Sequence, residues 1–335
     1  MNAITRKDAY PLARIDDLLE SLGGAVWFCT LDLASGYWQV PIAPLDKEKT
    51  AFATKRGMFQ FKYMPFGLSN APATFVRLMD EVLKGLIGKH CLVYLDDVII
   101  FGQTFDQTLS NLKLIFDRIR QHKLTLKAKK CVLFRKEVEF LGHMVTAQGV
   151  QTSPAKVEAV KTWPIPSNGA EIRSFLGFAS YYRKFIPYFS SISAPLTNLT
   201  RKKVKFIWDA SCQNSFETLQ QKLIEAPVLA YPTPDDEFVL DTDASGAGIG
   251  AVLSQIQNGE EKVIAYASKS LSKAQRNYCT TYRELLAVVT FVKGFKHYLW
   301  GRKFLIRTDH ASLTWLLNFK EPEGMISRWL ATLFI

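Results

Sequence analysis

The chain has 335 residues, of which 48% are hydrophobic and 22% are charged, a balance typical of globular rather than disordered proteins. Its 42 lysines and arginines outnumber its 31 acidic residues, and the net charge of +11 favours a polyanionic partner, either nucleic acid or an anionic membrane surface. No apolar run approaches roughly 18 residues, the N-terminus lacks the apolar region of a signal peptide, and five scattered cysteines indicate neither a disulfide framework nor a zinc site. We therefore expect an intracellular globular protein of two or three domains.

The first predicted strand ends in a carboxylate. Residues 25–39, AVWFCTLDLASGYWQ, follow a period of two, which places on one face Val26, Phe28, Thr30 and Asp32. We expect Asp32 to end a buried strand.

Two neighbouring carboxylates lie inside an apolar run at residues 90–102, HCLVYLDDVIIFG. The short β-rich runs CLVYL and VIIF are separated by two residues, Asp96 and Asp97, which is the spacing of a hairpin. This pair supplies the positive φ of a two-residue turn poorly compared with Asn-Gly or Asp-Gly, and two ionised carboxylates so close repel each other. The pattern is therefore either an acidic hairpin turn or a cation site.

The next segment predicts a helix followed by a basic strip. Residues 106–124 carry one apolar stripe, with Asp106 as the expected N-cap. Residues 118–136, RIRQHKLTLKAKKCVLFRK, concentrate cations on a surface that would meet phosphates. One further helix is expected to begin at residues 153–154, and another lies within residues 169–186. The expected stripes are Leu109, Leu112, Phe116 and Ile119 in the first helix and Ile172, Phe175, Ala179 and Tyr182 in the last.

Prolines mark a domain boundary in APVLAYPTPDDE, at Pro227, Pro232 and Pro234. Beyond it, EFVLDTD predicts a strand ending at Asp243. The glycines that follow are spaced G-x-G-x-G and lead into a second strand, which excludes a dinucleotide-binding loop because that loop is G-x-G-x-x-G and opens a helix.

Two more carboxylates of this half each have a structural explanation. Glu284 lies in a predicted helix, where Thr281 followed three residues later by Glu284 fits a capping box. Asp309 stands between a predicted strand and a predicted helix, and fits a cap residue. Taken singly, neither carboxylate indicates a site.

Carboxylates from distant parts of the chain would form a metal site if the fold brought them together. Asp32 would join Asp96 and Asp97 if the first strand and the hairpin were neighbours. Three carboxylates around two Mg²⁺ ions roughly 3.5 to 4 Å apart form the cation clamp of in-line phosphoryl transfer.

Six segments resemble, in order, the palm motifs of reverse transcriptases. They are YPLARIDDLLESLGGA, LDLASGYWQVPI, TAFATKRGMFQFKYMPFGLSNAPATF, LVYLDDVIIF, LTLKAKKCVLF and VEFLGHMV. Nearly the whole chain resembles the reverse transcriptase and ribonuclease H parts of the Pol polyprotein of Ty3/gypsy-type long-terminal-repeat retrotransposons. This resemblance implies an α+β fold: a ferredoxin-like reverse-transcriptase palm with thumb/connection helices, followed by an α/β RNase H-like domain.

The resemblance also implies three regions. Residues 1–150 would form the palm with partial fingers, residues 151–226 the thumb/connection helices, and residues 227–335 a C-terminally truncated RNase H-like domain. We expect the chain to be a fragment of a longer Pol, because the upstream fingers segment and the final acidic residue of RNase H have no counterpart in it.

For the polymerase site, the resemblance implies that Asp32 and Asp96 bridge two catalytic Mg²⁺ ions, which Mn²⁺ could replace, and that Asp97 supports them. Tyr37 matches the aromatic gate that excludes a ribose 2′-OH. From the residues alone, Tyr37 is equally an aromatic of the core.

The same resemblance assigns residues to the incoming nucleotide. Phe66 and Gly67, in MPFGLSNAPATF, match the loop that cradles it, and Phe66 stands where retroviral enzymes have glutamine. Lys130 resembles the lysine that protonates the pyrophosphate leaving group, although by itself it is equally a phosphate-facing cation. Residues 140–145, FLGHMV, resemble the primer grip.

In the second half, TDAS, YRELLAVV and TDHASL match in order the acidic triad of ribonuclease H. Asp243, Glu284 and Asp309 would then hold the metal ions that hydrolyse RNA in an RNA/DNA hybrid.

The implied function is an RNA-directed DNA polymerase with associated RNase H. Its expected partners are an RNA template, a DNA primer, an RNA/DNA hybrid, dNTPs and other Pol or Gag products, with no membrane. The expected location is the cytoplasm, in a virus-like particle, or the nucleus. The alternative is a catalytically inactive, nucleic-acid-binding remnant of Pol. A stand-alone hybrid nuclease is a weaker alternative, since it would leave most of the chain without a purpose.

Overall fold

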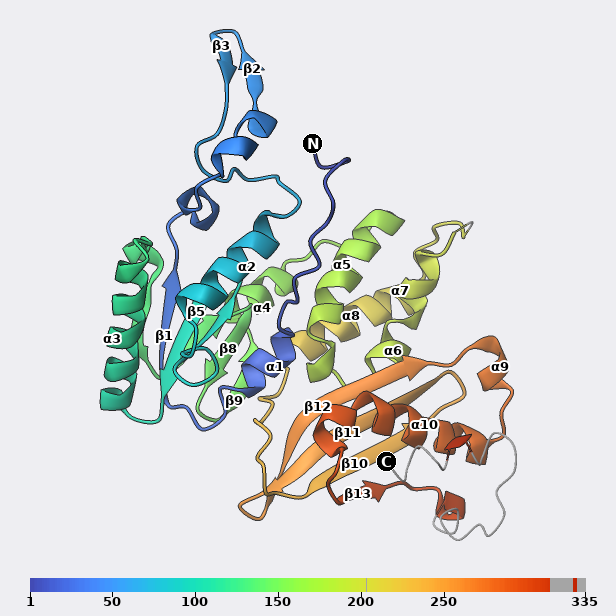
Figure 1. Cartoon of the computed structure of the whole chain (residues 1–335). Helices are drawn as coiled ribbons and strands as arrows, with labels where there is room; N and C mark the ends of the chain where they lie inside the picture. Colours follow the sequence, from blue (N-terminus) through green and yellow to red (C-terminus); the bar gives the residue numbers. More distant parts are fainter. Residues whose placement is uncertain (203, 314–327, 330–335) are drawn as a thin grey trace. The chain divides into compact units, whose positions relative to one another are not determined.

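The computed structural model describes residues 1–202, 204–313 and 328–329, and the chain divides into two compact units, residues 1–147 and 148–335 (Figure 1). The expected boundary near residue 226 lies inside the second unit and stays a prediction. The expected C-terminal truncation concerns residues that lie mostly outside the described ones. Within the described residues, no helix combines the length and apolarity that a membrane span requires.

The first unit is built on a four-stranded antiparallel sheet of order β4-β5-β1-β6, with two separate strand pairs, β2–β3 and β7–β8. Its helices and strands are α1 (Ile15–Glu20), β1 (Trp27–Asp32), the 3₁₀ helices η1 (Gly36–Gln39), η2 (Pro44–Asp46) and η3 (Glu48–Thr50), β2 (Phe52–Thr54), β3 (Gly57–Phe59), α2 (Ala71–Val82), β4 (Cys91–Tyr94), β5 (Asp97–Gly102), α3 (Phe105–Gln121), η4 (Ala128–Lys130), β6 (Val132–Arg135), β7 (Glu137–Phe140) and β8 (His143–Thr146).

Strand β1 covers less of residues 25–39 than their period of two suggested, but it ends at the predicted residue. The strand stops at Asp32, as expected, whereas residues 36–39 form η1 instead of continuing it. Ser35 has a φ of +52°, which lies outside the extended range of a strand, so the strand does not run on through it.

One face of the sheet is covered by two helices. Buried Phe75 and Met79 of α2 and Ile115 of α3 pack in one core cluster with Cys29 and Leu31 of β1. Each such buried side chain contributes about 1.5–3 kcal/mol to stability. Because side chains alternate along a strand, Asp32 points to the opposite face, which these helices leave open.

The hairpin turn lies one residue earlier than predicted. Tyr94 pairs with Asp97, so the two-residue turn is Leu95–Asp96 and Asp97 belongs to β5. Leu95 takes the positive φ, +56°, that the first central residue of such a turn requires and that glycine normally supplies.

Helix α3 has its expected span within a few residues, but its N-cap differs. The Thr104 side chain accepts a hydrogen bond from the Gln107 N–H at 3.2 Å, and Asp106 lies inside the first turn, where the helix dipole favours a carboxylate. The predicted cap at Asp106 is therefore wrong.

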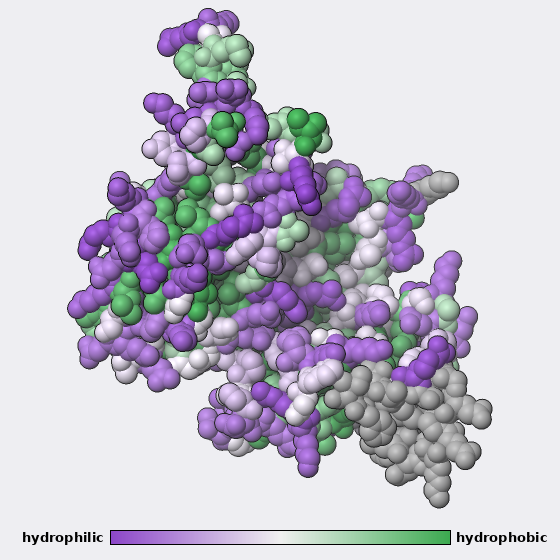
Figure 2. All heavy atoms as spheres, in the orientation of Figure 1, coloured by the Kyte–Doolittle hydropathy of each residue, from purple (hydrophilic) through white to green (hydrophobic). Residues whose placement is uncertain are grey.

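The β2–β3 hairpin carries apolar side chains on its surface (Figure 2). Phe52 lies 6.0 Å from Phe59 and 5.1 Å from Phe61 between ring centroids, and Met58 is 78% exposed. A two-stranded hairpin is only marginally stable by itself, so these ring contacts help to hold it.

The second unit contains a four-stranded sheet of order β12-β11-β10-β13, in which β10 and β13 are parallel and the other neighbours antiparallel. Its helices and strands are β9 (Gly149–Thr152), α4 (Pro154–Lys161), α5 (Gly169–Tyr181), η5 (Arg183–Phe185), α6 (Phe189–Ile192), α7 (Ala194–Leu199), α8 (Ala210–Ile224), β10 (Phe238–Ala244), β11 (Gly248–Gln257), β12 (Glu260–Ser270), α9 (Lys273–Arg276), α10 (Thr280–Gly294), α11 (Lys296–Leu299), β13 (Phe304–Arg307) and η6 (Ala311–Leu313).

The two faces of this sheet are covered by different segments. Leu286 and Ala287 of α10 share a core cluster with Leu240 of β10 and Leu253 of β11. On the other face, residues 183–192, which we call the connection segment, contact β12. The predicted stripe of α5 is confirmed at Ile172, Phe175, Ala179 and Tyr182, all of them buried.

Close packing at η1 predicts a stability defect in the variant Gly36→Ala. A Cβ at Gly36 would lie 2.7 Å from Cζ of the fully buried Phe75, so the ring must move. We expect the free energy of unfolding to fall by about 1–3 kcal/mol, measured by urea denaturation.

Gly177→Ala is the matched control. Nothing lies within 4 Å of a Cβ at this position in α5, and alanine is the better helix former, so stability should hold or rise by up to about 1 kcal/mol. Equal losses in the two variants would show that packing against Phe75 is not the cause.

Candidate active sites

The first unit places two carboxylates on the open face of its sheet and a third in the turn beside them. Asp32 and Asp97 are direct partners on neighbouring antiparallel strands, so their side chains share one face. Asp96 occupies the adjoining turn. Like charges directly opposite each other are destabilising, so this sheet carries a repulsion that its own strand pairing imposes.

Lys130 offsets part of this repulsion. Its Nζ lies 2.8 Å from Oδ2 of Asp32, and the pKa of Lys130 is raised, first by that hydrogen bond and then by the charge of Asp32. The pKa of Asp97 is also raised, by loss of hydration and then by Asp96 and Asp32, while Lys130 lowers it. Lys130 and Asp97 therefore each interact electrostatically with the other three predicted residues.

Tyr37 lies beside these charges. Its ring centroid is 5.2 Å from that of Phe66 and 5.5 Å from that of Phe75, so it packs at the edge of the core. Its pKa is raised by burial and then by the charge of Asp96. Phe66 is 60% exposed, and Gly67 takes a φ of +92°. The half-buried ring of Tyr37 is thus compatible with both interpretations, an aromatic of the core and a residue of the site.

A hollow of about 660 Å³ opens on the same face. Asp32, Asp97 and Lys130 line it on the sheet side, and residues 137–142 of the β7–β8 hairpin line the other side. The segment predicted to grip the primer therefore faces the carboxylates across a space large enough for a small molecule or a strand end.

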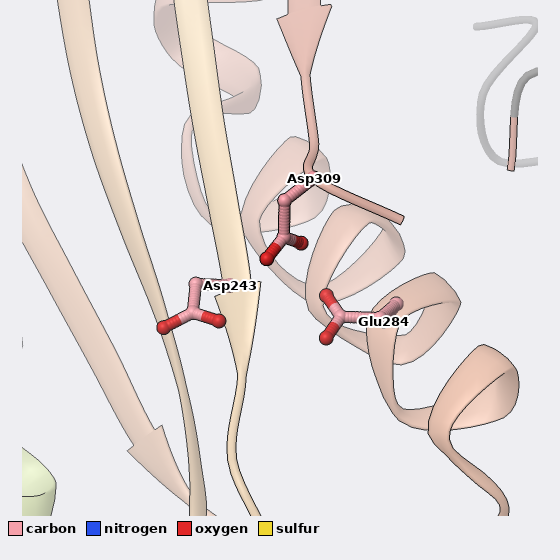
Figure 3. A group of neighbouring side chains, drawn as sticks. All are labelled: Asp243, Glu284 and Asp309. Carbon is pink, nitrogen blue, oxygen red and sulfur yellow. The ribbon is translucent and has the colours of Figure 1, made fainter. Parts of the chain in front are cut away.

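The second unit gathers its carboxylates more tightly. In the part of the chain that the structure describes, only Asp243, Glu284 and Asp309 bring three ligand atoms within 4.8 Å of one another (Figure 3). The three palm carboxylates are not grouped that closely.

Strand direction explains this cluster. Because β10 and β13 are parallel, their carboxyl ends meet at one edge of the sheet, which places Asp243 near Asp309. Helix α10 packs against β10 and directs Glu284 to the same edge. The pairing of distant segments, rather than any local motif, therefore assembles the site.

Glu284 is the buried member, with 4% of its surface exposed. Its pKa is raised, first by burial and then by the charges of Asp243 and Asp309, while a hydrogen bond from the Ala244 backbone lowers it. Its Oε2 atom is buried and has no hydrogen-bond partner among the residues that the structure describes. A buried oxygen without a partner, next to two further carboxylates, fits a divalent cation, because a metal ion satisfies that oxygen and neutralises the repulsion.

The capping-box explanation of Glu284 is wrong. Helix α10 begins at Thr280, and within the described residues the side chain of its N-cap, Cys279, accepts no capping hydrogen bond from the helix backbone. Thr281 lies inside the helix instead, with its Oγ1 3.0 Å from Nε2 of His310.

One residue near this cluster escaped the sequence reasoning. Tyr188 lies against Gly250, the strand partner of Asp243, and its pKa is raised by burial, by the charge of Asp243 and by a hydrogen bond to Asp243. No periodicity or motif distinguishes it, because it sits in a short irregular segment far from the triad in sequence.

Comparison with known proteins gives two family matches. Residues 1–145 match the family described as reverse transcriptase (RNA-dependent DNA polymerase), and residues 208–306 match the RNase H-like domain found in reverse transcriptase.

Curated relatives match along nearly the whole chain. It is 44% identical over 330 residues to the Pol polyprotein of transposon 297 from Drosophila melanogaster, covering 98% of this chain and 31% of the relative. The chain is 38% identical over 342 residues to the Pol polyprotein of transposon gypsy from the same species, an alignment that covers 98% of this chain and 33% of the relative. It is 33% identical over 334 residues to the Tf2-3 polyprotein of Schizosaccharomyces pombe, which covers 98% of this chain and 25% of the relative. The chain thus spans a third or less of these relatives.

Solved structures show the same fold. The foamy viral protease-reverse transcriptase in complex with dsDNA matches with a TM-score of 0.85 at 24% identity, covering 99% of this chain and 70% of that one. The foamy viral protease-reverse transcriptase dRH in complex with dsDNA matches with a TM-score of 0.87 at 23% identity, and the match covers 99% of this chain and 59% of that one. The predicted fold class is confirmed.

The raised pKa of Glu284 predicts that Glu284→Gln stabilises the metal-free protein at neutral pH. A carboxyl whose folded pKa is raised binds its proton more tightly when folded. Its destabilising effect is therefore absent below the unfolded pKa, appears as the pH rises from there to the folded pKa, and is complete above it. We expect a gain on the order of 1 kcal/mol at about pH 7.5 and little at about pH 4.

Urea denaturation in EDTA measures this difference. Added Mg²⁺ should narrow it, because a cation bound only to the folded wild type stabilises that form. A variant that is less stable than the wild type at both pH values would contradict the prediction.

Proposed function

The chain belongs to the reverse transcriptases of retrotransposon Pol polyproteins, and we propose that it is the polymerase and RNase H part of such a protein. The observation that carries this proposal is that each unit places carboxylates from distant segments together: Asp32 opposite Asp97 in one, and the Asp243–Glu284–Asp309 group in the other. Extending a DNA primer along an RNA template requires a polymerase centre, and degrading that RNA afterwards requires a nuclease centre.

In the polymerase step, Asp32 and Asp96 would hold the metal ions and Asp97 would support them. A bound Mg²⁺ or Mn²⁺ ion would supply the charge that lowers the pKa of the primer 3′-OH and neutralises the α-phosphate and the pyrophosphate. Tyr37 would exclude a ribose 2′-OH by its bulk, and Phe66 and Gly67 would contact the incoming dNTP. The primer end would occupy the hollow between β1 and the β7–β8 hairpin.

Lys130 has to change partner during this step. Its ammonium group neutralises Asp32 in the metal-free site, at 2.8 Å. Once a cation takes over that charge, Lys130 would be released toward the pyrophosphate, where it would donate a proton to the leaving oxygen.

In the second unit, Asp243, Glu284 and Asp309 would hold the ions for hydrolysis of RNA in an RNA/DNA hybrid. The net charge of +11 supports binding of the primer–template duplex and of the RNA/DNA hybrid, because basic residues displace the counterions of nucleic acid. Other Pol and Gag products would be partners in a virus-like particle.

Paired substitutions separate the two activities. Asp96→Asn should reduce primer extension on an RNA template by more than roughly 100-fold and leave hybrid cleavage unchanged, and Asp243→Asn should do the reverse. Even groups that only orient metal ligands are worth 10–100-fold. The measurements are gel-based primer extension and cleavage of a labelled hybrid in Mg²⁺, with this chain and with a version extended by the fingers segment of a relative.

Asp106→Asn is the control for loss of one negative charge, since Asp106 is an exposed residue in the first turn of α3. Extension by neither wild-type form, with salt-sensitive nucleic-acid binding retained, would favour the inactive binding remnant instead.

Lys130→Arg separates a proton donor from a phosphate-facing cation. Arginine keeps the positive charge but does not give up a proton at neutral pH. We therefore expect the single-turnover rate of extension to fall by roughly 10²-fold while the apparent Kd for dNTP changes little. An unchanged rate would assign Lys130 to phosphate binding only.

A further inference from the structure

The connection segment, residues 183–192, is fixed on the face of the RNase H-like sheet that α10 does not cover. The Ser190 N–H donates to Oγ of Ser268 at 2.8 Å, and Nη2 of Arg183 donates to the Ser268 carbonyl at 2.8 Å. These contacts attach the segment to β12, the strand that pairs with β11. The segment lies before residue 208, where the family match of this domain begins.

Between these anchors, Tyr188 lies across β11 toward β10. A Cβ at Gly250 would come within 3.0 Å of Cδ1 and Cε1 of its ring, so the ring rests directly on the backbone where a side chain would otherwise stand. Gly250 is the strand partner of Asp243. The ring and Asp243 both line a small hollow of about 70 Å³, together with Pro187.

The hydroxyl group of Tyr188 reaches the carboxylate cluster. It interacts with Asp243 through a hydrogen bond, and both residues line the same hollow. A phenol is protonated at neutral pH and can therefore act as the donor. The backbone of Tyr188 takes a φ of +55°, a conformation that is unfavourable for a bulky residue. The anchors on either side hold it there.

We propose that Tyr188 is a positioning residue of the second carboxylate site: its hydroxyl donates to Asp243 and fixes the orientation in which this carboxylate shares a divalent cation with Glu284 and Asp309. This inference rests on the proposed RNase H function of the site. It gives the connection segment a role in the affinity for metal, although this segment lies outside the residues that match the RNase H-like family.

The test compares Tyr188→Phe with the wild type in metal binding and in cleavage. Phenylalanine keeps the ring on Gly250 and the backbone anchors and removes only the donor. Mn²⁺ titration, followed by calorimetry and by the shift in melting temperature, should show an affinity about 10-fold weaker, as for other groups that orient metal ligands. The Mg²⁺ concentration for half-maximal hybrid cleavage should rise by a similar factor, with the rate recovering at saturating metal.

Three comparisons keep this result specific. Tyr266→Phe removes a hydroxyl from the same sheet, at a tyrosine whose pKa is raised by burial, and should leave metal affinity unchanged. Tyr188→Asn accepts the left-handed backbone but cannot place a phenol, so it should reproduce the Tyr188→Phe shift. Primer extension should not change in any of these variants.

The outcomes separate the two proposals. Wild-type metal affinity in Tyr188→Phe, with Asp243→Asn losing metal binding, would overturn the role of Tyr188 and leave the RNase H function intact. A wild type that neither binds Mn²⁺ at Asp243 nor cleaves the hybrid would overturn the RNase H function, and the role of Tyr188 with it.

Discussion

Repulsion between carboxylates that the fold forces together governs both units of this chain. In the first unit, antiparallel pairing sets Asp32 opposite Asp97, and in the second, the parallel pairing of β10 and β13 sets Asp243 beside Asp309. Neither arrangement can be relieved by a side-chain rotation alone, because strand register fixes where each side chain starts. The repulsion is relieved by a positive charge at each site, supplied by the protein or by a bound cation, or by a proton that one carboxyl group retains.

The two sites meet this requirement differently. Lys130 supplies the positive charge at the first site, and its long side chain reaches Asp32 from outside the strands. At the second site Glu284 is buried, and within the described part of the chain its Oε2 has no hydrogen-bond partner. The first site can thus exist in a neutralised, metal-free form, whereas the second depends on a cation more directly. This difference follows from burial: a solvent-exposed pair is screened by water, but a buried carboxylate is not.

Sequence patterns predicted the elements that local chemistry controls and missed what register and tertiary contacts decide. The period of two located the end of β1 at Asp32, and apolar spacing located the buried stripe of α5. The hairpin was found from its spacing, but its turn was displaced by one residue because strand pairing forces Leu95 to positive φ, against its local preference. The capping box at Thr281 was wrong because helix α10 begins at Thr280, which places Thr281 inside the helix, where its hydroxyl contacts His310 instead. Tyr188 carried no signal, since only the packing of the connection segment on β12 brings it to Asp243.

Strained backbone occurs next to a carboxylate in both candidate sites. Leu95 immediately precedes Asp96 in the turn, and Tyr188 contacts Asp243, and both hold left-handed φ values, +56° and +55°, without being glycine. Such a conformation costs on the order of 1 kcal/mol at each residue and persists only where surrounding contacts dictate it. Around Leu95 those contacts are the β4–β5 hydrogen bonds, and around Tyr188 they are the hydrogen bonds to Ser268. A relaxed turn would point Asp96 elsewhere, and a relaxed connection segment would withdraw the phenol. The strain and the charge repulsion are thus two parts of one constraint, because the strained backbone holds the carboxylates, and the group that orients one of them, in place.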